Sequence, residues 1–156
     1  MLKELFGTLG LNAWSLLKIP MIAFIGPSIK QLDDETCVVN VPLNFRTRNH
    51  LGSMYFAAIA AGADLAGGAL AMQFIFQSGK NISLIFKDFQ AQFLKRPEDD
   101  VLFTCTQGAE IKQLVDEAIR TKERVEFPMK ITATVPSKFG DEPVGKFILT
   151  LSLKEK

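Results

Sequence analysis

Asp64 is the residue of this chain whose setting most strongly indicates chemistry. It lies in the run NHLGSMYFAAIAAGADLAGGALAMQFIFQ (residues 49–77) and is the only charged residue between His50 and Lys80. A carboxylate in an apolar run is costly to bury unless it is hydrogen-bonded, paired with a cation or retained for a reaction. A carboxylate retained for a reaction can act as a general base or as a nucleophile. Asp64 is therefore the first candidate for a functional residue.

The cysteine and histidine content argues against other common chemistries. Cys37 and Cys105 both lie in apolar, strand-like runs, which predicts reduced thiols packed as small hydrophobic side chains. The single histidine, His50, lies in a polar turn with no evident tie to either thiol, so a Cys–His nucleophile is not expected. One histidine and two cysteines are too few for the four Cys and His ligands of a structural zinc site, so we expect no bound metal.

The element that must position Asp64 is a long helix, predicted at about residues 52–76. Such a helix would be roughly 35 Å long. A sheet of five or six strands is about 25–30 Å across, so one helix can cross all of it. The alanines and glycines of the segment allow close packing on every side, which predicts a buried central helix. Asn49 or Ser53 could cap its start, and His50 could lie at the surface of the same turn.

The same segment, over residues 51–79, is long enough and apolar enough to be interpreted as a membrane span. Against this, Asp64 lies near its middle, where a carboxylate is expensive in lipid. The run is also rich in Gly and Ala rather than Leu and Ile, and the rest of the chain consists of amphipathic strands that need a helix to cover one face. We therefore predict a core helix and no membrane span.

The segments before this helix predict an N-terminal helix and a β-hairpin. Apolar residues at helical spacing predict a helix over residues 2–17, within an N-terminal extension of residues 1–20, and Pro20 would end or kink it. Residues 28–32 and 36–43 flank the polar turn at residues 33–35 and predict a hairpin. Pro42 in the second strand predicts an edge position or the end of that strand.

The strand predicted at residues 81–95 changes phase in its middle. Its apolar side chains occupy even positions up to Phe86 and odd positions from Phe89 onward. Because side chains alternate between the two faces of a strand, one extra residue is needed to keep both sets on one face. The sequence therefore predicts a β-bulge near Lys87 and Asp88.

The remaining segments complete an α+β arrangement. We predict a strand at residues 101–106, an amphipathic helix at 109–122, a strand at 124–135, a turn at 138–141 and a strand at 144–153. Six antiparallel strands would then wrap around one central helix.

The bulk composition is that of a globular protein. With 156 residues, 47% of them hydrophobic and 22% charged, the chain is expected to form one domain over residues 1–156. A net charge of +1 gives no electrostatic reason to expect nucleic acid as a partner. Glu4, Lys18 and Pro20 interrupt the apolar N-terminus, which is unlike a secretory signal, so we expect a cytoplasmic protein.

The order of elements and the stretch RNHLGSMYFAAIAAGADLAGG resemble the hotdog fold. Over residues 28–154 the chain is similar to the PaaI-like acyl-CoA thioesterases and to a poorly characterised bacterial family beside them. Members of the PaaI-like group carry an Asn, then His-Gly-Gly six residues on, then a catalytic Asp or Glu nine residues after that His. Asn49 matches the Asn and Asp64 matches the acid. The His-Gly-Gly position is occupied by Tyr55, Phe56 and Ala57, and His50 lies five residues too early to fill it.

This resemblance implies a division of labour within the site. A backbone N–H at the helix start, that of Phe56 or Ala57, would polarise the thioester carbonyl. Asp64 would act as general base on water or as nucleophile, and Asn49 would orient the water or the carbonyl. The other residues expected to bind substrate are Tyr55, His50, Ser53, Lys95 and Arg96. Arg46 and Arg48 could join Lys95 and Arg96 in pairing with the phosphates of coenzyme A.

Each of these roles has a structural alternative. Asp64 could only hydrogen-bond groups at a subunit interface, Asn49 could only cap the helix, and Tyr55 could only pack. His50 and the basic residues could simply be solvated at the surface.

The leading hypothesis is a homodimer, or a dimer of dimers, that hydrolyses an acyl-CoA or a related acyl thioester. The resemblance implies that Asp64 lies opposite a carbonyl site of the partner subunit, and that no cofactor is needed beyond the coenzyme A of the substrate. The alternative is a non-catalytic hotdog module that binds an acyl chain or another hydrophobic ligand. A dehydratase of the same fold is a third and weaker hypothesis, because it would need a histidine in the site.

Overall fold

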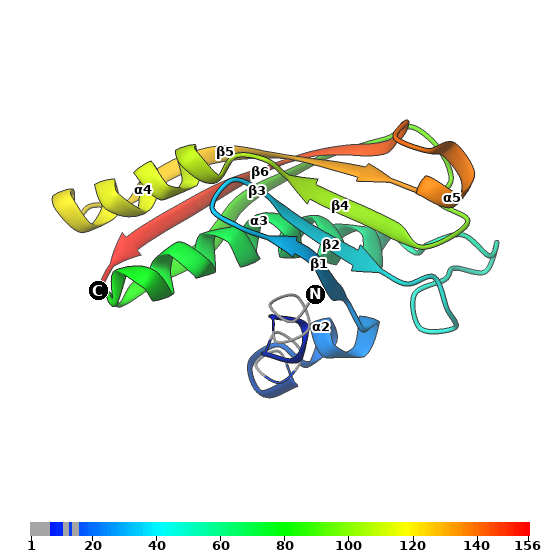
Figure 1. The fold of residues 1–156 in the computed structure, drawn as a ribbon, viewed down its shortest axis with the longest axis horizontal. Coiled ribbons are helices and arrows are strands. Elements are labelled where there is room, and N and C mark those ends of the chain that lie inside the picture. Colours follow the sequence, from blue (N-terminus) through cyan, green and yellow to red (C-terminus); the bar gives the residue numbers. More distant parts are fainter. Residues whose placement is uncertain (1–6, 11–12, 14–15) are drawn as a thin grey trace.

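The computed structural model describes residues 7–10, 13 and 16–156. In this part of the chain a six-stranded antiparallel sheet, with strand order β1-β2-β4-β5-β6-β3, curves around one long helix, α3 (Figure 1). The elements are α2 (Pro20–Ile25), β1 (Ser28–Leu32), β2 (Cys37–Val41), α3 (Phe56–Ser78), β3 (Ile82–Phe93), β4 (Val101–Cys105), α4 (Gly108–Thr121), β5 (Val125–Thr134), α5 (Pro136–Phe139) and β6 (Pro143–Glu155). The architecture confirms the expected α+β hotdog fold.

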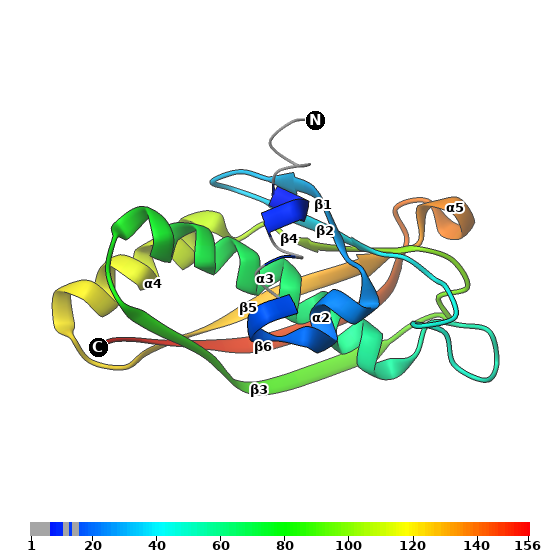
Figure 2. The same cartoon turned by 90° about the horizontal axis from the view of Figure 1, so that it is seen from below.

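The N-terminal segment lies on the side of α3 that faces away from the sheet (Figures 1 and 2). Residues 7–10, 13 and 16–18 are helical, whereas Leu2, Leu5 and Phe6 of the predicted helix lie outside the described residues. Pro20 begins the short helix α2. A proline is tolerated there because an N–H at the first position of a helix would have no acceptor within the helix. Gly26, with φ of 65°, closes this helix in a left-handed conformation.

The predicted hairpin and the predicted bulge are both confirmed. β1 and β2 pair around a turn in which Asp33 Oδ1 accepts the N–H groups of Glu35 and Thr36, at 2.9 and 2.8 Å. β2 lies inside the sheet and ends one residue before Pro42, so this proline marks the end of the strand. In β3, Phe86 pairs with Leu151 and Phe89 pairs with Leu149, which leaves one extra residue at the predicted place.

The predicted start of the central helix, at residue 52, is wrong by four residues. α3 begins at Phe56, and Tyr55 is its extended N-cap residue. The backbone just before it is committed to other partners, because Met54 N–H donates to the carbonyl of Pro97 and Tyr55 N–H donates to that of Thr47. Gly52, with φ of 81°, also takes a conformation that helical residues do not adopt.

The turn predicted at residues 138–141 is partly helical. The short helix α5 begins at Pro136 and is closed by hydrogen bonds from Lys138 and Phe139 N–H to the carbonyl of Val135. Gly140 and Asp141 form the turn that follows it, with a hydrogen bond from Glu142 N–H to the carbonyl of Phe139. A proline in the first turn favours such a start because its φ is already helical.

α3 is also long and apolar enough to cross a membrane by length and composition alone. In this fold 61% of its most apolar 18-residue window is buried, against the sheet and against α4. The burial is possible because glycines bring the helix close to the strands. The Cα of Gly62 lies over the ring of Phe103 and that of Gly67 over the side chain of Met129, with no room for a Cβ. Eight of the 23 residues of the helix are alanine, which also allow close packing.

Glycine packing under α3 can be tested with a pair of alanine substitutions. A Cβ at Gly62 would overlap the ring of Phe103, which is fully buried and cannot move outward. We expect Gly62→Ala to lower the free energy of unfolding by about 2–3 kcal/mol. At Gly68 a Cβ would meet ordinary contacts at 3.6–3.9 Å, so Gly68→Ala should be neutral or should stabilise by up to about 1 kcal/mol. Urea denaturation of both variants is the measurement, and equal destabilisation would contradict this packing.

Candidate functional site

Asp64 lies in the middle of α3, on the side of the helix that faces β3. Its Oδ1 lies beside Gly68, one turn further on, and the same spot is lined by the ring of Phe86 from β3. The side chain is mostly buried, and no hydrogen bond or ion pair to it occurs within the described part of the chain. Asp64 is thus a carboxylate without a compensating partner in the single protomer.

Burial raises the pKa of Asp64 from 3.8 to about 6, because a desolvated carboxylate loses the hydration of its charged form. The only cause of the shift is desolvation, with no neighbouring charge involved. A carboxylate of this kind is still ionised at neutral pH, yet it accepts a proton more readily than an ordinary aspartate. These are the properties of a general base that works near neutrality.

The start of α3 presents unpaired hydrogen-bond donors. Tyr55 is the N-cap residue and makes no side-chain cap, and the first helical hydrogen bond is that from Ile59 N–H to the Tyr55 carbonyl. Within the described residues, the N–H groups of Phe56, Ala57 and Ala58 have no protein acceptor. Uncapped donors at a helix N-terminus, together with the helix dipole, favour a negatively charged oxygen. The two amides expected from the sequence, those of Phe56 and Ala57, are among these donors.

Asn49 and Ser53 build the turn that precedes the helix rather than capping the helix itself. Asn49 Oδ1 accepts the N–H groups of Leu51 at 2.9 Å and Ser53 at 3.2 Å, and its Nδ2 donates to Ser53 Oγ at 3.0 Å. Ser53 is buried, with 4% of its surface exposed. The amide group of Asn49 is therefore occupied by its own turn, which gives it a positioning role for the helix start.

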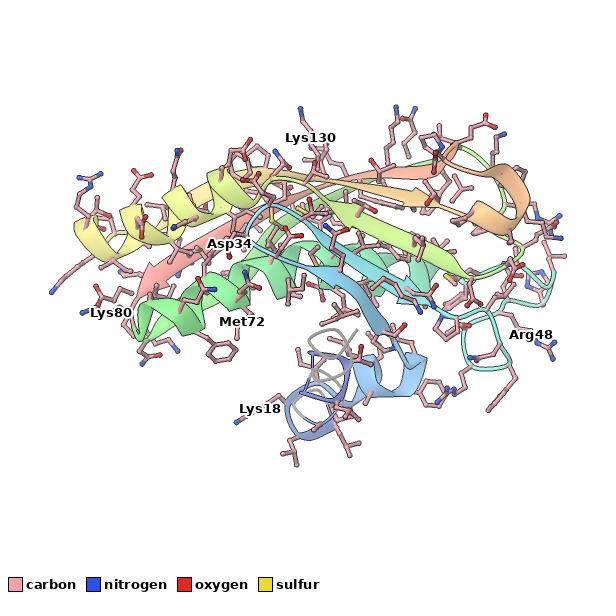
Figure 3. All side chains as sticks on the ribbon, in the orientation of Figure 1. Lys18, Asp34, Arg48, Met72, Lys80 and Lys130 are labelled. Carbon is pink, nitrogen blue, oxygen red and sulfur yellow. The ribbon has the colours of Figure 1, made fainter. Side chains whose placement is uncertain are left out.

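An open hollow of about 500 Å³ lies beside this turn. It is lined by Arg48, Asn49, His50, Tyr55 and Phe56, so four of the residues expected from the sequence meet there. Arg48, which the sequence indicated only as a phosphate partner, points outward from the loop (Figure 3). The hollow thus brings the guanidinium of Arg48 next to the unpaired donors of the helix start.

Lys95 and Arg96 lie near the hollow but do not line it. Lys95 forms an ion pair with Glu142 at 2.6 Å and lies 4.6 Å from the ring centroid of Phe139. Arg96 donates to the carbonyl of Leu51 at 3.2 Å and so holds the turn from outside, while it also reaches Glu98 at 3.5 Å. Arg96 therefore lies at the rim of the site, whereas the ammonium of Lys95 is held in its ion pair with Glu142.

The ring of Phe56 does not stand over the helix start but leans toward β3. Its centroid lies 5.8 Å from that of Phe93, and Phe93 in turn contacts the buried Phe147 edge-on at 6.1 Å. Phe89 stacks on the same Phe147 at 5.8 Å. Phe56, Phe89 and Phe93 remain 56%, 37% and 50% exposed, so an apolar surface extends from the helix start along the inner face of β3.

Asp64 and the helix start do not meet within one protomer. Asp64 lies eight residues beyond Phe56, which is roughly 12 Å along the helix axis. One small carbonyl group cannot contact both. The two halves of the expected site are present in the chain, but a single subunit does not bring them together.

Other chemistries find little support in the described residues. No group of three or more His, Cys, Asp or Glu side chains in that part of the chain could hold a metal ion. Cys37 and Cys105 face each other across β2 and β4 and are completely buried. Burial raises the pKa of Cys37 to about 12, which makes its thiol a poor nucleophile.

Comparison with known proteins places this geometry in context. The family described as "Domain of unknown function (DUF4442)" matches residues 8–141. No curated protein matches the chain.

Among solved structures, a protein of unknown function from Pseudomonas aeruginosa, described as a probable thioesterase, is 24% identical. The match covers 89% of each chain with a TM-score of 0.73. A protein of unknown function from Chlorobaculum tepidum has a TM-score of 0.82 at 12% identity, over 96% of this chain and 94% of that one. A thioesterase from Haemophilus influenzae has a TM-score of 0.65 at 14% identity, over 93% and 88%. At these identities the likeness establishes the fold, and the fold is that of thioesterase structures.

The desolvation of Asp64 predicts a pH dependence of stability. Because the folded-state pKa is raised, the folded chain binds more protons than the unfolded chain between pH 3.8 and about 6, and stability falls as the pH rises through that window. Asp64→Asn removes this loss and should stabilise the protein at neutral pH by up to about 3 kcal/mol. Urea denaturation at a series of pH values is the measurement. Asp116→Asn, on the exposed face of α4, is the matched control and should retain the wild-type pH dependence.

Proposed function

The chain belongs to the family described as "Domain of unknown function (DUF4442)", and from its geometry we propose that it is a homodimeric hydrolase of acyl thioesters, with coenzyme A as the carrier. The observation that carries the proposal is the uncapped start of α3, where three N–H groups have no acceptor among the described residues, beside an open hollow. The description of two similar structures as thioesterases supports the same chemistry.

In the proposed reaction the thioester carbonyl oxygen accepts hydrogen bonds from the amides of Phe56 and Ala57. Negative charge grows on this oxygen when the carbonyl carbon becomes tetrahedral, and preorganised donors at a helix N-terminus stabilise it. These donors belong to the backbone, so the side chains at the two positions can differ without loss of the donors. The ring of Phe56 packs toward Phe93, and the hollow that Phe56 helps to line lies beside these N–H groups.

Asp64 supplies the base. Its carboxylate takes a proton from water while the water oxygen forms a bond to the carbonyl carbon, and the carbon–sulfur bond then breaks. The acyl group leaves as a carboxylic acid, and the protonated Asp64 gives its proton to the thiolate of coenzyme A, which restores the carboxylate. A pKa of about 6 keeps Asp64 ionised at neutral pH and basic enough for this step.

The separation of Asp64 from the helix start requires a second subunit in this mechanism. β3 is an edge of the sheet, and its inner face carries the exposed rings of Phe89 and Phe93. A twelve-residue edge strand with apolar side chains is unusual in a monomer, because it offers unpaired backbone groups to another chain. Pairing of two β3 strands about a two-fold axis would cover these rings and bring Asp64 of one protomer toward the helix start of its partner.

Arg48 and His50 would contact the phosphates of coenzyme A at the mouth of the hollow, with Arg96 at its rim. Asn49 and Ser53 act as positioning residues, because their hydrogen bonds hold the turn that carries Arg48 and His50. Lys95 has no part in this scheme, since its ammonium is paired with Glu142.

The role of the backbone donor can be tested without changing the acid. Proline is tolerated in the first turn of a helix, and Tyr55 has the extended ψ of 143° that a following proline requires. Phe56→Pro removes both the ring and the N–H, whereas Phe56→Ala, the matched control, removes only the ring. We expect kcat for acyl-CoA hydrolysis to be about 10²–10³-fold lower in Phe56→Pro than in Phe56→Ala, with similar KM. Equal rates in the two variants would exclude the Phe56 amide as a donor.

The composite site can be tested by mixing two inactive variants. Asp64→Asn should lower thiol release from a panel of acyl-CoA substrates by about 10²–10⁴-fold. When Asp64→Asn and Phe56→Pro chains are unfolded and refolded together, half of the dimers are mixed and each mixed dimer has one intact site. The mixture should therefore recover about a quarter of the wild-type activity.

No recovery on mixing would show that both groups serve the same protomer. Hydrolysis that persists in Asp64→Asn would remove the acid from the mechanism. Binding of acyl ligands without hydrolysis of any acyl-CoA by the wild type would instead favour the non-catalytic binding module.

A further inference from the structure

Helix α2 is apolar on both of its sides. Ile22 and Ile25 are buried against the body of the protein, whereas Met21 and Phe24, on the opposite side, are 58% and 57% exposed. Residues 16–27 contain a single charged residue, Lys18. A helix at the surface of a soluble protein normally carries polar residues on its outer side, so an apolar outer side indicates that something else covers it.

The apolar surface continues on both sides of α2. Leu16, Leu17 and Ile19, just before the helix, are 64%, 82% and 40% exposed, and Phe45 in the loop after β2 is 78% exposed. The guanidinium of Arg46 lies 5.9 Å from the ring centroids of both Phe24 and Phe45, which joins α2 to this loop. We call the exposed side chains of Leu16, Leu17, Ile19, Met21, Phe24 and Phe45 the basal face. Figure 2, seen from below, shows α2 in front of α3 on this side of the molecule.

Within the segments of the chain that carry the basal face, the charges all have one sign. Between Leu5 and Leu32 the sequence contains two charged residues, Lys18 and Lys30, and between Thr36 and Ala63 it has no Asp or Glu. Lys18, Arg46 and Arg48 form no ion pair with any described residue. The cations of these segments are therefore not neutralised by ion pairs, and they attract an anionic partner.

We propose that the basal face docks onto an anionic phospholipid surface. Large apolar side chains flanked by cations and free of acids are what a membrane interface accommodates, with the side chains among the acyl carbons and the cations beside the phosphates. Arg46 is suited to this boundary, because its guanidinium already rests against two rings that would enter the lipid.

A second copy of this chain fits the basal face less well. In a two-fold contact the same surface would meet itself, so Lys18 and Arg46 would face their own like charges with no acid nearby to pair with. The docking is peripheral and involves α2 and the following loop, while α3 stays in the core. It is also independent of the proposed hydrolysis, since it can be measured without any acyl-CoA.

Vesicle sedimentation of the full chain tests the proposal. We expect strong binding to vesicles of phosphatidylcholine mixed with phosphatidylglycerol, weak binding to phosphatidylcholine alone, and release as salt is added. Leu17→Ser combined with Phe24→Ser, and separately Lys18→Glu, should each lower the bound fraction several-fold. The matched controls are Ile85→Ser, on the outer face of β3, and Lys146→Glu, on the outer face of β6, which should bind like the wild type. In Figure 3, Lys130 marks the outer face of the sheet and Lys18 marks the side of the basal face, on the opposite side of the molecule.

A labelling experiment covers the case in which a serine variant folds poorly. Cys37 and Cys105 have no exposed surface, so a thiol-reactive, environment-sensitive dye will attach selectively to Met21→Cys or to the control Lys146→Cys. Vesicles containing phosphatidylglycerol should shift the emission of the dye to the blue at Met21→Cys and leave it unchanged at Lys146→Cys. Equal responses at the two positions, or no binding to either vesicle, would overturn the proposal. A concentration-dependent dimer in solution that Phe24→Ser abolishes would also overturn the proposal, because a second copy of the chain would then cover the basal face.

Discussion

The close contact of α3 with the sheet is the constraint on which the rest of this structure depends. Gly62 and Gly67 place the helix backbone directly on Phe103 and Met129, because at these two positions there is no room for a side chain. Eight of its 23 residues are alanine and most of the others are apolar, so the helix has no continuous polar face. It is therefore covered by β2, β4 and β5 on one side and by α4 on another, whereas Phe76 near its end stays 68% exposed. Asp64 is the single carboxylate left on such a helix, and its desolvation is a direct result.

The same constraint places the two halves of the candidate site, Asp64 and the helix start, on one helix. The helix start is fixed by backbone hydrogen bonds from Met54 to Pro97 and from Tyr55 to Thr47, and its first amides are left without acceptors among the described residues. A buried helix cannot bend to bring these amides to Asp64. The inner face of β3 carries exposed rings and makes few contacts with α3. We therefore look to a second subunit, rather than to a movement within one, as the means of completing the site.

The sequence predicted most of the fold because strand and helix periods are local properties. The phase change in β3 was sufficient to predict the bulge between Phe86 and Phe89, since only one extra residue keeps both apolar sets inward. The helix start was predicted four residues too early because it depends on Pro97 and Thr47, which are distant contacts that no local pattern reveals. For the same reason the sequence could not predict the ion pair between Lys95 and Glu142. Nor could it predict that the side-chain amide of Asn49 forms hydrogen bonds within its own turn. Side-chain identities indicated where the site residues lie, but tertiary partners decide which of them are free.

The replacement of His-Gly-Gly by Tyr55, Phe56 and Ala57 is the main departure from the resembled thioesterases. It affects how closely a substrate could approach the backbone at the helix start. Glycines at a helix start allow a substrate to approach the backbone, and a Cβ narrows that approach. Here the ring of Phe56 packs toward Phe93, with 5.8 Å between the two ring centroids. Tyr55 keeps its own N–H bonded to Thr47, and its half-exposed side chain lines the hollow instead. In the proposed reaction Tyr55 and Phe56 would therefore flank the approach to the helix start, and a substrate would reach the amides of Phe56 and Ala57 between them.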